Sequence, residues 1–269
     1  PYKKFESCSL EPDKIYLFHE EINLPIPEKG KGSIDTGKEA LAYIDRAVTL
    51  WKDKHIDAIV TAPVSKSYIE KTGIEFSGHT EYLAKQIDEP NPYMMMYSSE
   101  YSVLLASTHI PLSLVTDYVT EERLLSVIRM GHSSMKNIKN REPKLAIAGM
   151  DPHCGDDGAI GHFDIAITSK AVKIAQAEGI DIQGPYAADT LFLANSWKNF
   201  DCVIAHYHDQ GLIPFKMLAF DKGVNVTFGL SLVRTSPDHG TAYDIAGKNI
   251  ASYESMREAI LLAAELAAL

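Results

Sequence analysis

Residues 201–209 of the sequence, Asp-Cys-Val-Ile-Ala-His-Tyr-His-Asp, join a short apolar run directly to two histidines. Four apolar residues in a row are typical of a strand that is buried on both faces of a parallel sheet. Two further runs have the same form: Ser102–Ser107 leads to His109, and Lys144–Gly149 leads to His153. Ligands of open α/β sheets bind beyond the carboxyl ends of the strands. The three runs therefore predict histidines gathered at one edge of a sheet.

The rest of the chain alternates short apolar runs with amphipathic patterns. Ala58–Thr61 and Met94–Tyr97 are the other expected strands. Apolar residues spaced three and four apart predict helices over Lys38–Lys52, Glu121–Asn137, Asp164–Glu178 and Ser255–Ala268. The first helix is expected to begin near Ser33 or Asp35, and Thr120 is a suitable N-cap for the second. This alternation predicts an α/β protein with a largely parallel sheet.

Composition excludes several classes of protein. The 269 residues are 45% apolar and 23% charged, as in a globular chain of one large or two smaller domains. A net charge of -10 argues against nucleic-acid binding, no run of about eighteen apolar residues is present, and Pro1–Glu11 shows no basic-then-apolar signal pattern. Cys8, Cys154 and Cys202 show no close pairing. A cytoplasmic protein with no nucleic-acid or membrane partner is therefore expected.

Three imidazoles suit zinc or a similar divalent ion with one position open for substrate. The alternative is that each histidine caps a strand or bonds a loop carbonyl, which is the more common role of a single histidine. Strand alternation would point His206 and His208 the same way, so the residues alone leave open which of the two would bind. Asp209 is either a helix cap or an acceptor that orients a ligating imidazole.

Anion-binding residues are expected in two places. Ser77–Glu81, Ser-Gly-His-Thr-Glu, precedes the helical pattern Tyr82–Ile87, where backbone N–H groups and a hydroxyl could hold an anion, unless the stretch is a plain helix cap. Lys216, Asn225 and Arg234 could hold a phosphate and a carboxylate near a metal, the alternative being a solvated surface.

Two other features predict structure more than chemistry. Met94–Met96 is interpreted as core. Cys154 follows His153, but a cysteine without a base partner is weak evidence for a nucleophile.

Taken together, these motifs resemble the 4-hydroxythreonine-4-phosphate dehydrogenase, or PdxA, family of pyridoxal phosphate biosynthesis. The matching stretches follow the family's order over nearly the whole chain. They are Ser77–Glu81, Thr108–Leu112, Asp151–Gly155, Ala188–Phe192, Ala205–Lys216, Val224–Thr227, Arg234–Ala242 and Asp244–Gly247.

The resemblance implies a fold like that of isocitrate and isopropylmalate dehydrogenases: two α/β/α domains, a mixed, largely parallel sheet and a cleft between the domains. Residues 1–75 and 222–269 would form the outer, nucleotide-side domain, and residues 76–221 the central domain for dimerisation, metal and substrate. It also implies a homodimer whose active sites contain residues from both subunits. A Gly-x-Gly-x-x-Gly nucleotide loop is neither expected for this fold nor found.

The resemblance also implies roles for individual residues. The metal ligands would be His109, His153 and His208, which selects His208 over His206. The substrate contacts would be His79, Thr80, Lys216, Asn225 and Arg234. The nucleotide would lie near Asp238, His239, Gly240, Thr241 and Ala242. Lys216 is the expected proton-transfer group, with a purely electrostatic role as the alternative, and Asp189 would support catalysis.

The sequence departs from the family pattern in two places. The family opens on a strand and a Gly-Asp-Pro-Ala-Gly-Ile-Gly-Pro loop that lines the cleft, and this sequence contains neither. Either an N-terminal segment is missing from this sequence or the chain never had one. Asp151-Pro-His-Cys-Gly-Asp156 stands where the family usually has Asn-Pro-His-Ala-Gly-Glu. Asp151 adds negative charge beside an expected metal ligand, so a relative that oxidises a phosphorylated four-carbon sugar acid remains an alternative.

The expected activity is an NAD-dependent oxidation, with NADP as the alternative, assisted by zinc or else by cobalt or magnesium. The substrate would be 4-phosphooxy-threonine, which loses CO2 and becomes 3-amino-2-oxopropyl phosphate. Two other classes remain: a zinc hydrolase that activates water at the three histidines, and a non-catalytic relative that only binds phosphorylated acids. Formation of NADH separates the dehydrogenase from both.

Overall fold

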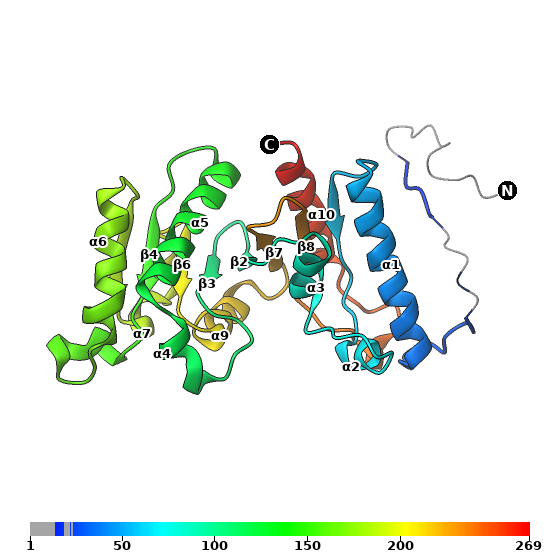
Figure 1. Ribbon diagram of the computed structural model, residues 1–269, viewed down its shortest axis with the longest axis horizontal. Coiled ribbons are helices and arrows are strands. Elements are labelled where there is room, and N and C mark those ends of the chain that lie inside the picture. Colours follow the sequence, from blue (N-terminus) through cyan, green and yellow to red (C-terminus); the bar gives the residue numbers. More distant parts are fainter. Residues whose placement is uncertain (1–13, 19–21, 23) are drawn as a thin grey trace.

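The structure, a computed structural model, describes residues 14–18, 22 and 24–269. Its described residues form one eight-stranded sheet in the order β1-β8-β7-β2-β3-β6-β4-β5 (Figure 1). The strands are Ala58–Val60 (β1), Tyr93–Tyr97 (β2), Ser102–Leu105 (β3), Leu145–Ala148 (β4), Ile182–Tyr186 (β5), Cys202–Ala205 (β6), Val224–Phe228 (β7) and Val233–Pro237 (β8). All five strands expected from the sequence are present.

The sheet is mixed, as expected. Strands β3, β6, β4 and β5 are parallel to one another, and β1 is parallel to β8, whereas β7 and β2 are each antiparallel to both of the strands beside them. The sequence analysis missed β5, β7 and β8. In β7 and β8 the polar residues Asn225, Thr227, Arg234 and Ser236 alternate with their neighbours, so neither strand has the continuous apolar run of a strand buried on both faces.

The helices are Ile34–Lys52 (α1), Lys66–Glu70 (α2), His79–Gln86 (α3), Val115–Tyr118 (α4), Glu121–Lys139 (α5), Ser169–Ala177 (α6), Ala188–Leu191 (α7), Ala194–Trp197 (α8), His208–Ala219 (α9) and Glu254–Ala267 (α10). Ser33 caps α1 and Thr120 caps α5, as expected. The helix expected over Asp164–Glu178 is divided, because residues Asp164–Thr168 form a π-helical turn before α6.

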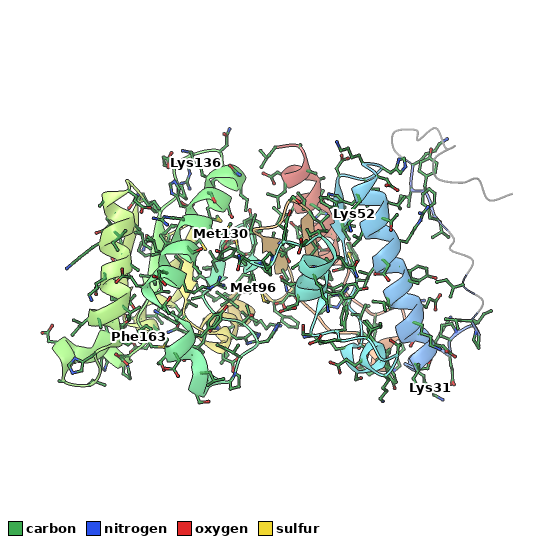
Figure 2. All side chains as sticks on the ribbon, in the orientation of Figure 1. Lys31, Lys52, Met96, Met130, Lys136 and Phe163 are labelled. Carbon is green, nitrogen blue, oxygen red and sulfur yellow. The ribbon has the colours of Figure 1, made fainter. Side chains whose placement is uncertain are left out.

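Helices cover both faces of the sheet. Helices α5, α6 and α10 pack on one face, and α1 and α9 pack on the other. Met95 belongs to the core on the α5 side, whereas Met94 and Met96 belong to the core on the α9 side, as alternation along a strand requires. Figure 2 shows Met96 in the middle of the molecule and Lys31, Lys52 and Lys136 at its margin. The interpretation of the three methionines as core is confirmed.

The sheet passes through two lobes (Figure 1). We call β1, β7, β8, α1, α2, α3 and α10 the outer lobe, and β2 to β6 with α4 to α9 the inner lobe. Phe76, Tyr82 and Leu83 pack in one cluster with Ile44 of α1 and Ile59 of β1, so α3 lies in the outer lobe although residues 76–221 were assigned to the central domain. The domain boundaries stay a prediction.

Among the described residues, no helix has both the length and the apolar character to cross a membrane.

Helix α9 lies very close to the sheet. A Cβ atom on Gly211 would come within 2.8 Å of Val103 Cγ2 and 2.9 Å of Leu105 Cδ2, so only glycine fits this approach without a shift of the neighbouring side chains. The helix carries His208 at its start and Lys216 near its end. Its contact with β3 and β6 therefore fixes the position of both side chains.

Candidate active site

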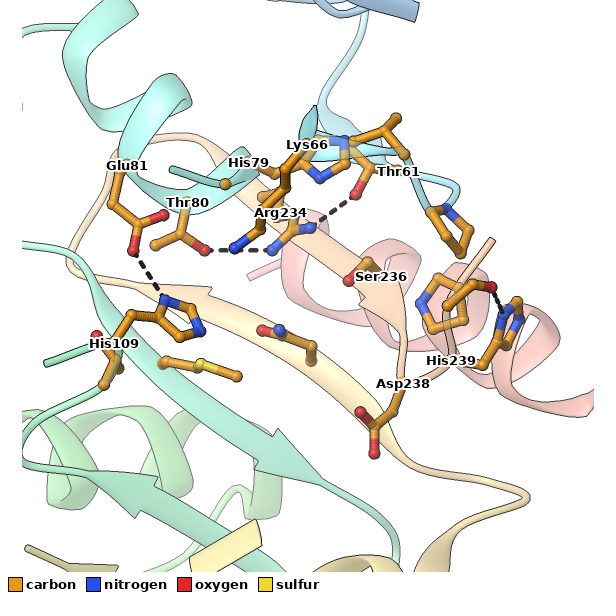
Figure 3. A pocket seen from close by; sticks show the side chains of 18 of the residues that line it. Thr61, Lys66, His79, Thr80, Glu81, His109, Arg234, Ser236, Asp238 and His239 are labelled. Carbon is orange, nitrogen blue, oxygen red and sulfur yellow. Dashed lines mark hydrogen bonds and ion pairs between the residues drawn. The ribbon is translucent and has the colours of Figure 1, made fainter. Parts of the chain in front are cut away.

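A cleft of about 590 Å³ lies on the α9 side of the sheet. Its lining includes His208, Leu212 and Lys216 of α9 and His79, Thr80 and Glu81 of α3. Figure 3 shows the α3 residues beside Arg234. The floor of the cleft is formed by β2, β7 and β8. The register sets Arg234 opposite Thr227 and Ser236 opposite Asn225, which places these polar side chains on one face of the sheet. The cleft brings together most of the expected site residues: His79, Thr80, His109, His208, Lys216, Asn225, Arg234, Asp238, His239 and Gly240.

Arg234 is the most deeply buried charge of the cleft, with 3% of its surface exposed. Its guanidinium donates to Thr61 Oγ1 at 2.8 Å, to Thr227 Oγ1 at 3.3 Å and to Thr80 Oγ1 at 3.4 Å. Burial lowers its pKa to about 10, although the negative charge of Glu81 acts in the opposite direction. Arg234 therefore stays positively charged at neutral pH, and three hydroxyl groups from separate segments hold it in place.

The cleft also contains most of the buried polar atoms that have no partner in the described part of the chain. Five such atoms line it: His79 Nε2, Glu81 Oε2, Asn225 Oδ1, Arg234 Nε and Asp238 Oδ2. Buried donors and acceptors normally have partners, and each one without a partner costs about 1–3 kcal/mol. Five in one cleft indicate that a polar ligand supplies the missing bonds.

His79 is neutral in the folded protein. Burial is the main cause that lowers its pKa to about 3, and the positive charges of Arg234 and Lys66 lower it further. Its ring meets Phe76 edge-on, with ring centres 5.7 Å apart. A neutral imidazole with a free Nε2 can bond a polar group of a ligand without adding charge.

His109 and His208 form a pair at the α9 side of the cleft, with ring centres 5.6 Å apart. His109 Nδ1 lies 3.4 Å from Glu81 Oε1, and His208 Nδ1 lies 2.7 Å from Asp209 Oδ1. A carboxylate that holds Nδ1 leaves Nε2 to face a metal. Two imidazoles on one tetrahedral zinc would have ring centres about 5 Å apart, given zinc–nitrogen bonds of about 2 Å. The pair fits a divalent ion.

The sequence analysis missed several residues of the site. One of them is Glu81, which contacts and orients His109. Asp209, by contrast, was a candidate for orienting an imidazole, and it does contact His208. The signal for Glu81 was present, because it belongs to the quoted Ser77–Glu81 motif, but only its neighbours were given roles. Thr61 ends an expected strand, and nothing in the sequence distinguishes it from other strand-end residues.

His153 lies apart from the histidine pair. It is exposed in the 3-10 segment Pro152–Gly158, where several residues in a row have positive φ. Within the described residues, no group of three or more histidine, cysteine or acidic side chains is arranged to hold a metal. Asp189 is exposed in α7, and it is one of the charges that, after burial, raise the pKa of the Cys154 thiol. One chain thus presents His109 and His208 in the cleft, and His153 and Asp189 outside it.

His206 and His208 point in different directions, contrary to the expectation from strand alternation. His206 is fully buried, its Nε2 lies 3.1 Å from Thr168 Oγ1, and burial lowers its pKa to about 4. The reason is that β6 ends at Ala205 and α9 begins at His208, so the two histidines do not share one strand.

The expected nucleotide residues follow β8. Asp238 accepts from Lys216 Nζ at 2.9 Å, and burial is the main cause that raises its pKa. Asp238, His239 and Gly240 line the cleft, whereas Thr241 lines a separate hollow of about 180 Å³ against α1 and α2. Ala242 has left-handed backbone and begins a short 3-10 turn. This loop therefore joins two adjoining hollows.

The comparisons with known proteins agree with this geometry. The family model of the pyridoxal phosphate biosynthetic protein PdxA matches residues 3–263. The chain is 44% identical to the 4-hydroxythreonine-4-phosphate dehydrogenase of Sulfurihydrogenibium sp. over 88% of this chain and 73% of that one. For the enzyme of the same name from Aquifex aeolicus the identity is 41%, over 98% and 82% of the two chains.

A solved structure gives the same result. The 4-hydroxythreonine-4-phosphate dehydrogenase of Klebsiella pneumoniae matches with a TM-score of 0.76 and 37% identity, over 88% of this chain and 72% of that one. Fold, cleft and sequence together define an oxidoreductase of vitamin B6 biosynthesis. The chain belongs to the PdxA family.

The depressed pKa of His79 makes stability depend on pH. The unfolded chain takes up a proton on His79 below about pH 6.5, whereas the folded chain does so only near pH 3, so the free energy of unfolding falls as the pH drops from about 6.5. The slope from this group is at most about 1.4 kcal/mol per pH unit. Urea unfolding between pH 7 and pH 4.5 should show a shallower slope in His79→Gln. The exposed His55 supplies the control, His55→Gln; an equal slope in both variants would contradict the prediction.

Proposed function

We propose that the cleft oxidises 4-hydroxythreonine 4-phosphate with NAD and a divalent metal, releasing CO2 and 3-amino-2-oxopropyl phosphate. The proposal rests on the five buried polar atoms that line the cleft and have no partner among the described residues. The buried Arg234 and the histidine pair His109 and His208 line the same cleft. A substrate with a phosphate at one end and a hydroxyl and an amine near its carboxylate matches such a cleft in polarity.

His109 and His208 are the residues that would hold the metal, through the Nε2 atoms that Glu81 and Asp209 leave free. A bound divalent ion supplies Lewis-acid stabilisation of negative charge that develops on the substrate hydroxyl. Zinc suits two or three imidazoles best, with cobalt and magnesium as the alternatives.

Arg234, Thr80 and Asn225 would bind and orient the anionic groups. Arg234 Nε and Asn225 Oδ1 lack partners and line the same cleft, and Thr80 Oγ1 is held within reach of the guanidinium. Neutral His79 adds a bond without charge. Fixing both ends of the substrate sets the reacting carbon in one position, which is a large part of catalysis.

Lys216 would move the proton. Its ammonium bonds Asp238 at 2.9 Å and lines the cleft, which favours delivery of a proton to the carbon left when CO2 departs. The loop Asp238–Ala242 would hold the nucleotide across the two adjoining hollows. Hydride transfer itself belongs to the chemistry of the nicotinamide.

The proposal is tested by measuring NADH formation with a panel of phosphorylated four-carbon acids and zinc, cobalt or magnesium. We expect turnover to require both a phosphate and a metal. Faster turnover of a phosphorylated sugar acid than of 4-hydroxythreonine 4-phosphate would instead show that the chain is the sugar-acid-oxidising relative that Asp151 suggests. Failure of every acid in the panel to yield NADH would contradict the proposal.

Two variants separate binding from proton transfer. Arg234→Lys keeps a charge but loses the planar fork, so the KM for substrate should rise about ten- to a hundredfold while the KM for NAD hardly changes. Lys216→Ala should lower kcat by about 10²–10⁴-fold if Lys216 moves a proton. A rise in KM alone for Lys216→Ala would instead assign it to binding.

A second copy of the chain would complete the metal site. Large apolar side chains are exposed on the segments that follow the two histidines in the chain: Leu112 and Leu114 after His109, and Ile213 and Met217 on α9 after His208. A hollow of about 270 Å³ is lined by Leu112 and by both histidines. We propose that a homodimer covers this surface and that His153 of the second copy enters the hollow as the third ligand.

Met217→Glu should therefore weaken both the dimer and the binding of zinc, because it sets a charge in the covered apolar surface. Ile260→Glu, on an exposed position of α10 on the other face of the sheet, is the matched control and should leave both unchanged. His153→Ala should lose zinc while the dimer persists. Sedimentation and metal content measure the two properties, and zinc retained in a monomeric Met217→Glu would contradict the shared site.

A further inference from the structure

Lys66 has an unusual position among the cations of the cleft. Lys216 is bonded to Asp238, and Arg234 is bonded to Thr61, whereas no hydrogen bond or ion pair joins Lys66 to any residue that the structure describes. Lys66 begins α2, and its side chain lines the cleft. Neither the sequence motifs nor the family resemblance gave it a role. An ammonium group without a partner in a cleft is available to an anionic ligand.

The Lys66 ammonium lies at the start of α3. Its Nζ is 3.4 Å from the point that a Cβ atom on Gly78 would occupy, and Glu81 Oε2 is 2.9 Å from the same point. Helix α3 begins there with no side-chain cap. Figure 3 shows Lys66 beside Arg234 and Thr61.

A built anion site results from these neighbours. Arg234 is more than nine-tenths buried, and its Nε has no partner among the described residues. Thr80 Oγ1 lies 3.4 Å from the same guanidinium. The uncapped helix start adds backbone N–H groups, which favour an anion through the helix dipole. Two cations, a hydroxyl and a helix N-terminus thus meet at one end of the cleft.

The charge at this end suits a phosphate better than a carboxylate. A phosphate monoester carries about -1.5 to -2 charges at pH 7, and a carboxylate carries one. The Glu81 carboxylate beside Lys66 already balances part of the positive charge, and without Lys66 its charge would repel an anion bound to Arg234. Lys66 is therefore the residue that makes this end of the cleft positive enough for a dianion.

We propose that Lys66 binds the phosphate group of the substrate together with Arg234, and that it sets the preference of the cleft for a doubly charged group. The identity of the substrate rests on the proposed function, but the binding of a phosphate monoester here does not. The substrate would then lie with its phosphate at α3 and its hydroxyl at His109 and His208.

Methyl phosphate and methyl sulfate provide the test, because they have the same shape and carry two charges and one charge near pH 7.5. Their binding to the unmodified chain and to variants is measured by calorimetry, with no nucleotide or substrate present. The unmodified chain should prefer methyl phosphate. Lys66→Met should weaken methyl phosphate binding about ten- to a hundredfold and weaken methyl sulfate binding much less.

Two further variants control the result. Lys66→Arg keeps the charge and should stay within about fivefold of the unmodified chain. Lys71→Met removes the lysine at the end of α2, which lies over the ring of Tyr68 and not in the cleft, and should change neither affinity. Equal loss in Lys66→Arg and Lys66→Met, unchanged affinity in Lys66→Met, or no methyl phosphate binding by the unmodified chain would overturn the proposal. A chain that binds methyl phosphate in this way but forms no NADH would contradict only the proposed function.

Discussion

The buried guanidinium of Arg234 is the charge on which the cleft depends. A buried charge is costly unless it is paired and hydrogen-bonded. Here Thr61, Thr80 and Thr227 accept its hydrogen bonds, and they come from the end of β1, from α3 and from β7. The interaction therefore fixes three segments far apart in the sequence. It also leaves Nε without a partner among the described residues, so that this nitrogen can donate to a ligand.

The continuous sheet gives the site its second constraint. Strands β3 and β6 lie side by side and end at the histidine pair, whereas β8 and β7 supply the floor. Because Gly211 allows α9 to lie directly on β3 and β6, His208 and Lys216 keep a fixed distance from the floor. The two histidines, Arg234 and Lys216 are thus held by one continuous sheet and the helix packed on it. Within the described residues, no third histidine, cysteine or acidic side chain completes a group with His109 and His208 that could hold a metal.

Much of the fold could be predicted from local patterns. The apolar runs of β3, β4 and β6 and the helix caps Ser33 and Thr120 carry their own signals. Strands β7 and β8 could not be found in this way, because their polar residues serve the cleft and interrupt the apolar pattern. The polar residues that line the cleft are thus also the reason why β7 and β8 could not be recognised in the sequence.

Part of the candidate site could likewise be predicted from the sequence, and part of it could not. The strand-end rule brought His109 and His208 together, since their strands are neighbours. It also predicted His153 at the same edge, but the strand that leads to His153 lies one place further along the sheet, and the loop that carries it passes through residues with positive φ. Lys66 carries no signal of its own, because an exposed lysine is common, and Glu81 belongs to the Ser77–Glu81 motif but received no role there. Only the approach of both side chains to Gly78, at the start of α3, shows what they face.

The most direct test of the central claim is a crystal structure of the chain with zinc and 4-hydroxythreonine 4-phosphate, grown without nucleotide so that no turnover occurs. Anomalous scattering locates the zinc, and the electron density locates the phosphate. The account predicts zinc on His109 and His208, completed by His153 of a second copy, with the phosphate on Arg234. Zinc bound away from the histidine pair, or a phosphate that avoids Arg234, would contradict it.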